Sequence, residues 1–128
     1  MLQLVSVVSA GFPSPASDYI EDRIDLNKEL IQRENATYFF RVSGESMTGA
    51  FIPANALLVV DRAEKPVHRS IVVAVVDGEF TVKRLIKNLN RHELQPENPH
   101  YKSIEISEFT QCEVWGVVMH IIIDAKTV

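Results

Sequence analysis

The stretch IVVAVVDGEFTVKRLI, residues 71–86, carries the clearest secondary-structure signal in the sequence. Asp77-Gly78 is a turn pair that accepts positive φ, and it separates two apolar, β-branched runs, residues 71–76 and 80–86. This arrangement predicts a β-hairpin.

Further strand signals lie on both sides of this hairpin. ATYFFRV, residues 36–42, is aromatic and β-branched, and residues 56–60 form a short apolar run between turn signals. HELQPENPHYKSIEIS, residues 92–107, carries strand fragments around a Pro-Asn loop. VWGVVMHIII, residues 114–123, is apolar on both faces and is predicted to be a buried closing strand. The chain is therefore predicted to be mainly β.

The N-terminal part has a different character. GFPSPASDY, residues 11–19, contains two prolines and is predicted to be extended and irregular. Ser17 or Asp18 is expected to cap a short helix that ends near Leu26. We therefore expect an N-terminal arm and lead-in over residues 1–40 and a β domain over residues 41–128.

The bulk properties exclude several classes of protein. The net charge of −4 argues against a basic face that binds nucleic acid directly. The single cysteine, Cys112, cannot form an internal disulfide and is expected to pack as a small hydrophobe. No apolar run approaches the ~20 residues of a membrane helix. MLQLVSVVSA, at the N-terminus, lacks Lys and Arg and is short for a signal peptide, so a cytoplasmic location is expected.

RVSGESMTG, residues 41–49, sets a serine between small and flexible neighbours just after a predicted strand. Serine is a poor nucleophile unless a base takes its proton, and a lysine can do so when burial disfavours its charged form. Lys83 shares one face of its strand with Thr81 and Leu85. That strand alone favours a solvated lysine, so a Ser–Lys pair is a hypothesis at this point.

Two other kinds of site have weaker support. A Ser–His pair stays open, although the sequence has no GxSxG motif and none of its histidines has a distinctive context. They are His68, His92, His100 and His120. No histidine pair has i, i+4 helical spacing and Cys112 has no CxxC partner, so no metal is expected. No glycine-rich phosphate loop is present, and no cofactor is expected.

Several segments together resemble a known family. They are GFPSPASDYIEDRIDLN, ATYFFRVSGESM, LLVVD, VVDGEFTVKRL, LQPENPHY, IEIS and WGVVMHII. In these segments the chain resembles the UmuD-like SOS mutagenesis proteins of the LexA-like family of self-cleaving Ser–Lys peptidases, peptidase S24. The resemblance implies a LexA/signal-peptidase-like catalytic domain of several small twisted antiparallel sheets, with an extended N-terminal arm.

The resemblance also implies roles for individual residues. Ser46 looks like the nucleophile, and Lys83, 37 residues later, looks like its general base. The backbone amides of Glu45 and Ser46 look like the oxyanion donors, and the bond between Ala10 and Gly11 looks like the self-cleavage site. Where the family has a glycine turn before LLVVD, this chain has Asn55, which also accepts positive φ.

The family's partners follow from the same resemblance. It implies a homodimer that is stimulated by the RecA–single-stranded-DNA filament to cleave its own arm. The shortened form would then serve a UmuC-like, error-prone translesion polymerase, with no sequence-specific DNA binding and no membrane. One alternative is a non-cleaving binding module that partners or regulates the polymerase. A signal-peptidase-like enzyme is a third, but it normally needs a membrane anchor.

Overall fold

The computed structural model describes residues 2–4, 10–11, 22–107 and 111–127. Its contacts divide the chain into two units, Met1–Gln32 and Arg33–Val128. This division lies eight residues before the predicted domain boundary, because strand β3 (Thr37–Arg41) pairs with β4 (Leu57–Asp61) in the second unit.

In the first unit a short strand pair is followed by a helix. Strand β1 (Leu2–Leu4) pairs antiparallel with β2 (Asp22–Ile24), and α1 (Leu26–Leu30) begins two residues later. The predicted position of the helix is wrong for the part that the structure describes. Residues 22–24 form a strand, and the helix begins at Leu26, where it was expected to end. Asp25 is the actual cap, and its side chain accepts the Asn27 amide at 3.0 Å. Ser17 and Asp18 lie outside the described residues.

The second unit is built on one antiparallel sheet of seven strands, which confirms the mainly-β prediction. These strands gather in one sheet instead of several small ones, in the order β3-β4-β9-β5-β6-β7-β8. The remaining elements are β5 (Ile71–Val76), β6 (Glu79–Lys87), β7 (His92–Gln95), β8 (Ile104–Ile106), β9 (Cys112–Ile122), and the 3-10 turns Glu34–Ala36, Thr48–Ala50 and Ala125–Thr127.

Two predicted turns are confirmed. Strands β5 and β6 form the hairpin, with Ile71 opposite Arg84 and Val76 opposite Glu79. Its turn residues Asp77 and Gly78 have φ of 49° and 83°. Asn55, in the turn before β4, has φ of 72°, as its replacement of a glycine predicted.

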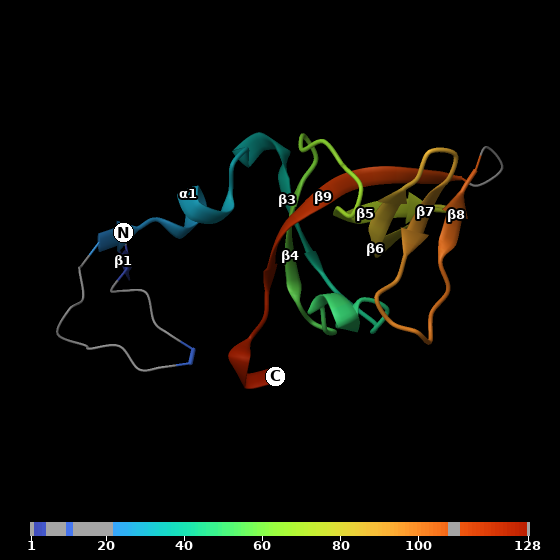
Figure 1. The fold of residues 1–128 in the computed structure, drawn as a ribbon. Helices are drawn as coiled ribbons and strands as arrows, with labels where there is room; N and C mark the ends of the chain where they lie inside the picture. Colours follow the sequence, from blue (N-terminus) through green and yellow to red (C-terminus); the bar gives the residue numbers. More distant parts are fainter. Residues whose placement is uncertain (1, 5–9, 12–21, 108–110, 128) are drawn as a thin grey trace. The chain divides into compact units, whose positions relative to one another are not determined.

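Strand β9 lies between β4 and β5 and joins the two parts of the sheet (Figure 1). It was predicted to be buried on both faces, but only Gly116 and Val117 are buried and Ile122 is exposed. Gly116 permits a close approach, because a Cβ there would lie 2.6 Å from the Val60 side chain. Half-buried side chains of β9 pack against both core clusters, so the strand joins the sheet through its backbone pairing and through partly buried contacts on both faces.

The core consists of two clusters. One contains Met47, Ala50, Ile52, Ala56, Leu58, Val60 and Val73, and the other contains Val72, Ala74, Leu85, Leu94 and Val117. Cys112 packs against the second cluster, as predicted for a small hydrophobe. Because Met47 is only 2% exposed, the first cluster anchors the backbone directly after Ser46.

Candidate active site

Ser46 lies in the turn that follows β3. Val42 and Asn55 tie the start of this segment to the turn before β4, since the Asn55 amide donates to Val42 O at 2.8 Å. Gly44 has φ of 86°, a conformation that a residue with a side chain rarely adopts. With Met47 buried on its other side, the serine is held in place by both the backbone turn and the core.

Lys83 reaches the same place from β6. It is 8% exposed, and its Nζ donates hydrogen bonds to Ser46 Oγ at 2.8 Å, to Thr81 Oγ1 at 3.0 Å and to Val82 O at 3.0 Å. The strand pattern alone predicted that Lys83 is exposed to solvent, and this prediction is wrong. The structure brings Ser46 and Lys83 into hydrogen-bond contact.

The surroundings of Lys83 disfavour its charged form. Burial lowers the pKa of the Lys83 ammonium from its usual value. Among the ion pairs of the described residues, none includes Lys83, and its three hydrogen-bond partners carry no formal charge. Such a lysine can give up its proton and accept one from a neighbouring hydroxyl.

The amides of Glu45 and Ser46 lie in the same turn. Their carbonyl oxygens are engaged, since Glu45 O accepts from Asn98 Nδ2 at 2.8 Å and Ser46 O accepts from the Glu97 amide at 2.8 Å. Neither N–H group donates a hydrogen bond to any of the residues that the structure describes. These two donors can therefore serve an incoming oxygen.

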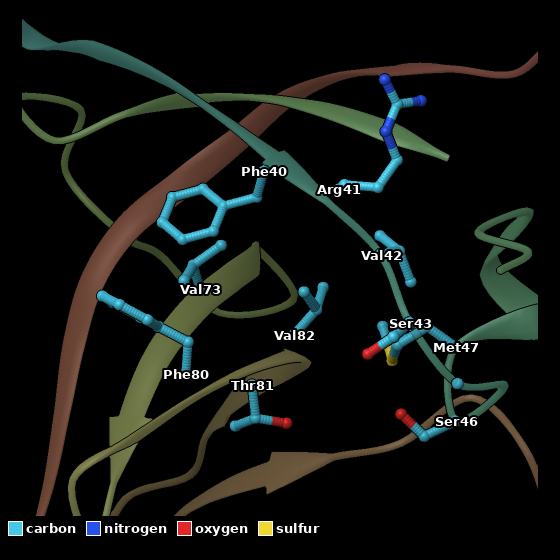
Figure 2. A pocket seen from close by; sticks show the side chains of 11 residues that line it. Phe40, Arg41, Val42, Ser43, Ser46, Met47, Val73, Phe80, Thr81 and Val82 are labelled. Carbon is cyan, nitrogen blue, oxygen red and sulfur yellow. The ribbon is translucent and has the colours of Figure 1, made fainter. Parts of the chain in front are cut away.

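A pocket of about 140 Å³, with both apolar and polar lining residues, adjoins Ser46. In Figure 2, Phe40, Val73 and Phe80 lie at one end of it and Ser46 at the other. The ring centroids of Phe40 and Phe80 are 5.1 Å apart, and both rings also contact Trp115 edge to face. The end formed by Phe40, Val73 and Phe80 suits an apolar group, and the Ser46 hydroxyl lies at the opposite end.

Sequence reasoning missed three residues around this pair. The signal for Thr81 was available, because it lies two residues before Lys83 on the same strand face. Glu97 and Asn98 gave no local signal, since they reach the serine turn from a loop more than 50 residues away.

The other predicted residues lie elsewhere. Ala10 and Gly11 are both exposed and belong to the first unit. None of the four histidines is among the residues that line the pocket. His68 instead accepts the Lys87 amide through Nδ1 at 3.0 Å. The described part of the chain contains no helix long and apolar enough to cross a membrane.

Comparison with known proteins shows the family of this chain. The Peptidase S24-like family matches residues 3–119. Protein ImpA of Escherichia coli is 50% identical over 115 residues, covering 88% of this chain and 77% of ImpA. Protein SamA of Salmonella typhimurium is 48% identical over 109 residues (85% and 75%), and protein MucA of Escherichia coli 43% over 118 residues (91% and 80%). The resemblance to peptidase S24 predicted from the sequence is confirmed.

Proposed function

This chain belongs to the Peptidase S24-like family, and we propose that it is a self-cleaving serine peptidase with Ser46 as nucleophile and Lys83 as general base. The observation that carries the proposal is the 2.8 Å contact between Lys83 Nζ and Ser46 Oγ. A Ser–Lys pair performs the same chemistry as a Ser–His pair when its lysine is neutral. The burial of Lys83 favours that neutral form.

The proposed reaction begins at Ser46. Neutral Lys83 takes the hydroxyl proton while Ser46 Oγ attacks the carbonyl carbon of Ala10. The amides of Glu45 and Ser46 donate to the resulting oxyanion. When the intermediate collapses, the Ala10–Gly11 bond breaks and the Lys83 ammonium protonates the departing Gly11 amine. A water molecule, deprotonated by Lys83, then hydrolyses the ester and releases Ser46 and the Ala10 carboxylate.

The biological role that we propose is in SOS mutagenesis. The RecA–single-stranded-DNA filament would stimulate cleavage in the cytoplasm, and the shortened homodimer would serve a UmuC-like translesion polymerase. The support is the resemblance of GFPSPASDY, RIDLN and SGESM to the UmuD-like proteins, together with the family membership. The net charge of −4 is consistent with action through protein partners rather than direct DNA binding.

The test is the intact mass of the purified chain after incubation with RecA, ATP and single-stranded DNA. A product that begins at Gly11 is expected from the wild type. Ser46→Ala should give none, because it lacks the nucleophile but keeps the turn and the core contact of Met47.

Incubation at pH 10 without RecA separates chemistry from stimulation, because a larger fraction of Lys83 is neutral there than at pH 7. Cleavage at pH 10 but not with RecA would support the peptidase and contradict the proposed stimulation. No cleavage under either condition would favour the non-cleaving binding module.

A further inference from the structure

We propose that Asn98 is a positioning residue that aims the oxyanion-binding amide of Ser46. The inference rests on the proposed peptidase function and concerns the loop at residues 96–98, which follows β7. This loop runs along the turn that contains the serine. Asn98 Nδ2 donates to Glu45 O at 2.8 Å, the Glu97 amide donates to Ser46 O at 2.8 Å, and the Gly49 amide donates to Glu97 O at 2.7 Å.

The first step of the argument is the geometry of a peptide bond. The carbonyl of Glu45 and the N–H of Ser46 belong to one planar group and point in opposite directions. Glu45 O accepts from Asn98 Nδ2 at 2.8 Å and, over a longer distance of 3.3 Å, from the Thr48 amide. By forming the shorter of these two bonds, Asn98 helps to fix the direction of the Ser46 N–H, which points away from the loop. The next peptide is also held, since its Ser46 carbonyl accepts from the Glu97 amide, and this bond keeps the serine turn in one conformation.

The second step is the electronic effect of the same hydrogen bond. A carbonyl that accepts a hydrogen bond polarises its peptide group and strengthens the N–H as a donor. Asn98 therefore prepares the Ser46 amide for the oxyanion in both direction and strength, without contacting the reacting atoms. An amide that is aimed before the reaction needs no reorganisation during it.

The loop is itself held in one position. Glu97 forms an ion pair with Arg84, the residue next to Lys83 on β6. Gly49 allows the close contact with the loop, because a Cβ there would lie 2.5 Å from Glu97 O. The loop thus links the turn that contains the serine to the strand that contains the lysine.

The orientation of the Asn98 amide follows from its other contacts. Nδ2 also donates to Thr48 Oγ1 at 3.3 Å. Asn98 Oδ1 accepts the His100 amide at 2.9 Å, so Nδ2 must face Glu45 O. Aspartate at this position would keep the acceptor for His100 but replace the donor by a carboxylate oxygen facing the Glu45 carbonyl. Asn98→Asp therefore removes the proposed action with almost no change in side-chain volume.

The test is the rate of self-cleavage from pH 6 to pH 10 for four chains: the wild type, Asn98→Asp, Asn98→Ala and Asn88→Asp. Asn88 is exposed, so Asn88→Asp is matched in charge change and should cleave like the wild type. Asn98→Asp should lower the plateau rate about a hundred-fold, as loss of one oxyanion donor does. Asn98→Ala should lower it about ten-fold, because it removes the donor without adding a repelling charge.

The apparent pKa of the rate profile separates positioning from other roles. It should stay at the wild-type value in Asn98→Ala, because Lys83 is untouched and no charge is added, whereas the new carboxylate of Asn98→Asp should raise it. Thermal unfolding should show both variants folded at the assay temperature. Wild-type plateau rates, a shifted apparent pKa in Asn98→Ala, or losses that simply follow unfolding would overturn this inference alone. A wild-type chain that remains uncut throughout would overturn the proposed function as well.

Discussion

Two charged side chains are buried among the described residues, and their surroundings differ. Asp61, at the end of β4, is 2% exposed and accepts hydrogen bonds from Arg33 at 2.6 Å and from the Ala63 amide at 2.7 Å. Lys83 is 8% exposed and has only two hydroxyls and a carbonyl as partners. One charge is neutralised by its partners, whereas the other is not.

The pKa values of both groups are lowered, but the shift favours the charged form of Asp61 and the neutral form of Lys83. For Asp61, burial raises the pKa, but the hydrogen bonds from the Ala63 amide and Arg33, together with the Arg33 charge, outweigh burial. The result favours the charged carboxylate. For Lys83, burial alone lowers the pKa and favours the neutral amine. A buried charge that is fully partnered supports the fold, whereas one without a counter-ion is available for proton transfer.

Of the substitutions that test this difference between Lys83 and Asp61, Lys83→Met should change the cleavage rate most. Methionine is neutral and similar in length, so the variant should fold but lose at least about a thousand-fold in cleavage rate, because it lacks the base. Its free energy of unfolding at pH 7 should be higher than that of the wild type, because no ammonium has to be buried. Intact mass and urea unfolding would measure the two quantities.

The stability difference between these chains should also depend on pH. The unfolded lysine titrates near 10.5 and the folded one lower, so the cost of burying its charge is fully present below the folded pKa. This cost disappears as the pH rises toward 10.5, and the two stabilities should converge. A Lys83→Met chain that is less stable than the wild type at pH 7 would contradict an uncompensated charge at this site.

The pH dependence of cleavage is the next largest effect. Only the neutral form of Lys83 can accept the serine proton, so the rate should rise up to ten-fold per pH unit below the folded pKa. It should level off at a midpoint below 10.5, because burial lowers this pKa. Initial rates measured from pH 6 to pH 10 would show the rise, and a flat profile would exclude Lys83 as the base.

Asp61→Asn should affect stability alone. The amide keeps the shape of the side chain but loses charge-assisted hydrogen bonds, so we expect a loss of about 1–3 kcal/mol at pH 7. The contribution of Asp61 is present above its unfolded pKa, near 3.8, and is lost as the pH falls through the lower folded value. Urea unfolding at pH 7 and pH 3 should therefore show a difference that narrows in acid.

Cleavage by Asp61→Asn provides the matching control. Its plateau rate and apparent pKa should equal those of the wild type, because Asp61 is not among the hydrogen-bond partners of Lys83. A variant as stable as the wild type at pH 7 would contradict the stabilising role of Asp61, and one with a shifted rate profile would show that the two buried charges are not independent.

Local features of this chain were readable from its sequence, whereas long-range ones were not. The hairpin turn at Asp77-Gly78 and the positive φ of Asn55 depend on neighbouring residues, and both were predicted. The helix was predicted too early, because the real capping residue, Asp25, lies between a strand and a helix.

The candidate site also combines features with a local sequence signal and features without one. Alternation placed Lys83 and Thr81 on one strand face, but pairing Lys83 with Ser46 rested on family resemblance. The contacts of Asn98 had no local signal at all, because they depend on how the strands are ordered in the sheet.

The position of β9 has a consequence for the timing of protein synthesis. Ser46 follows β3 and Lys83 lies on β6, and the strand pairs β3-β4 and β5-β6 are joined in the sheet only through β9. Residues 112–122 are translated after both pairs. A nascent chain that lacks these residues therefore carries its serine and its lysine on strand pairs that do not yet belong to one sheet, and only the loop and core contacts around Ser46 can join them. The sheet that supports the Ser46–Lys83 pair is thus completed only when residues 112–122 have left the exit tunnel.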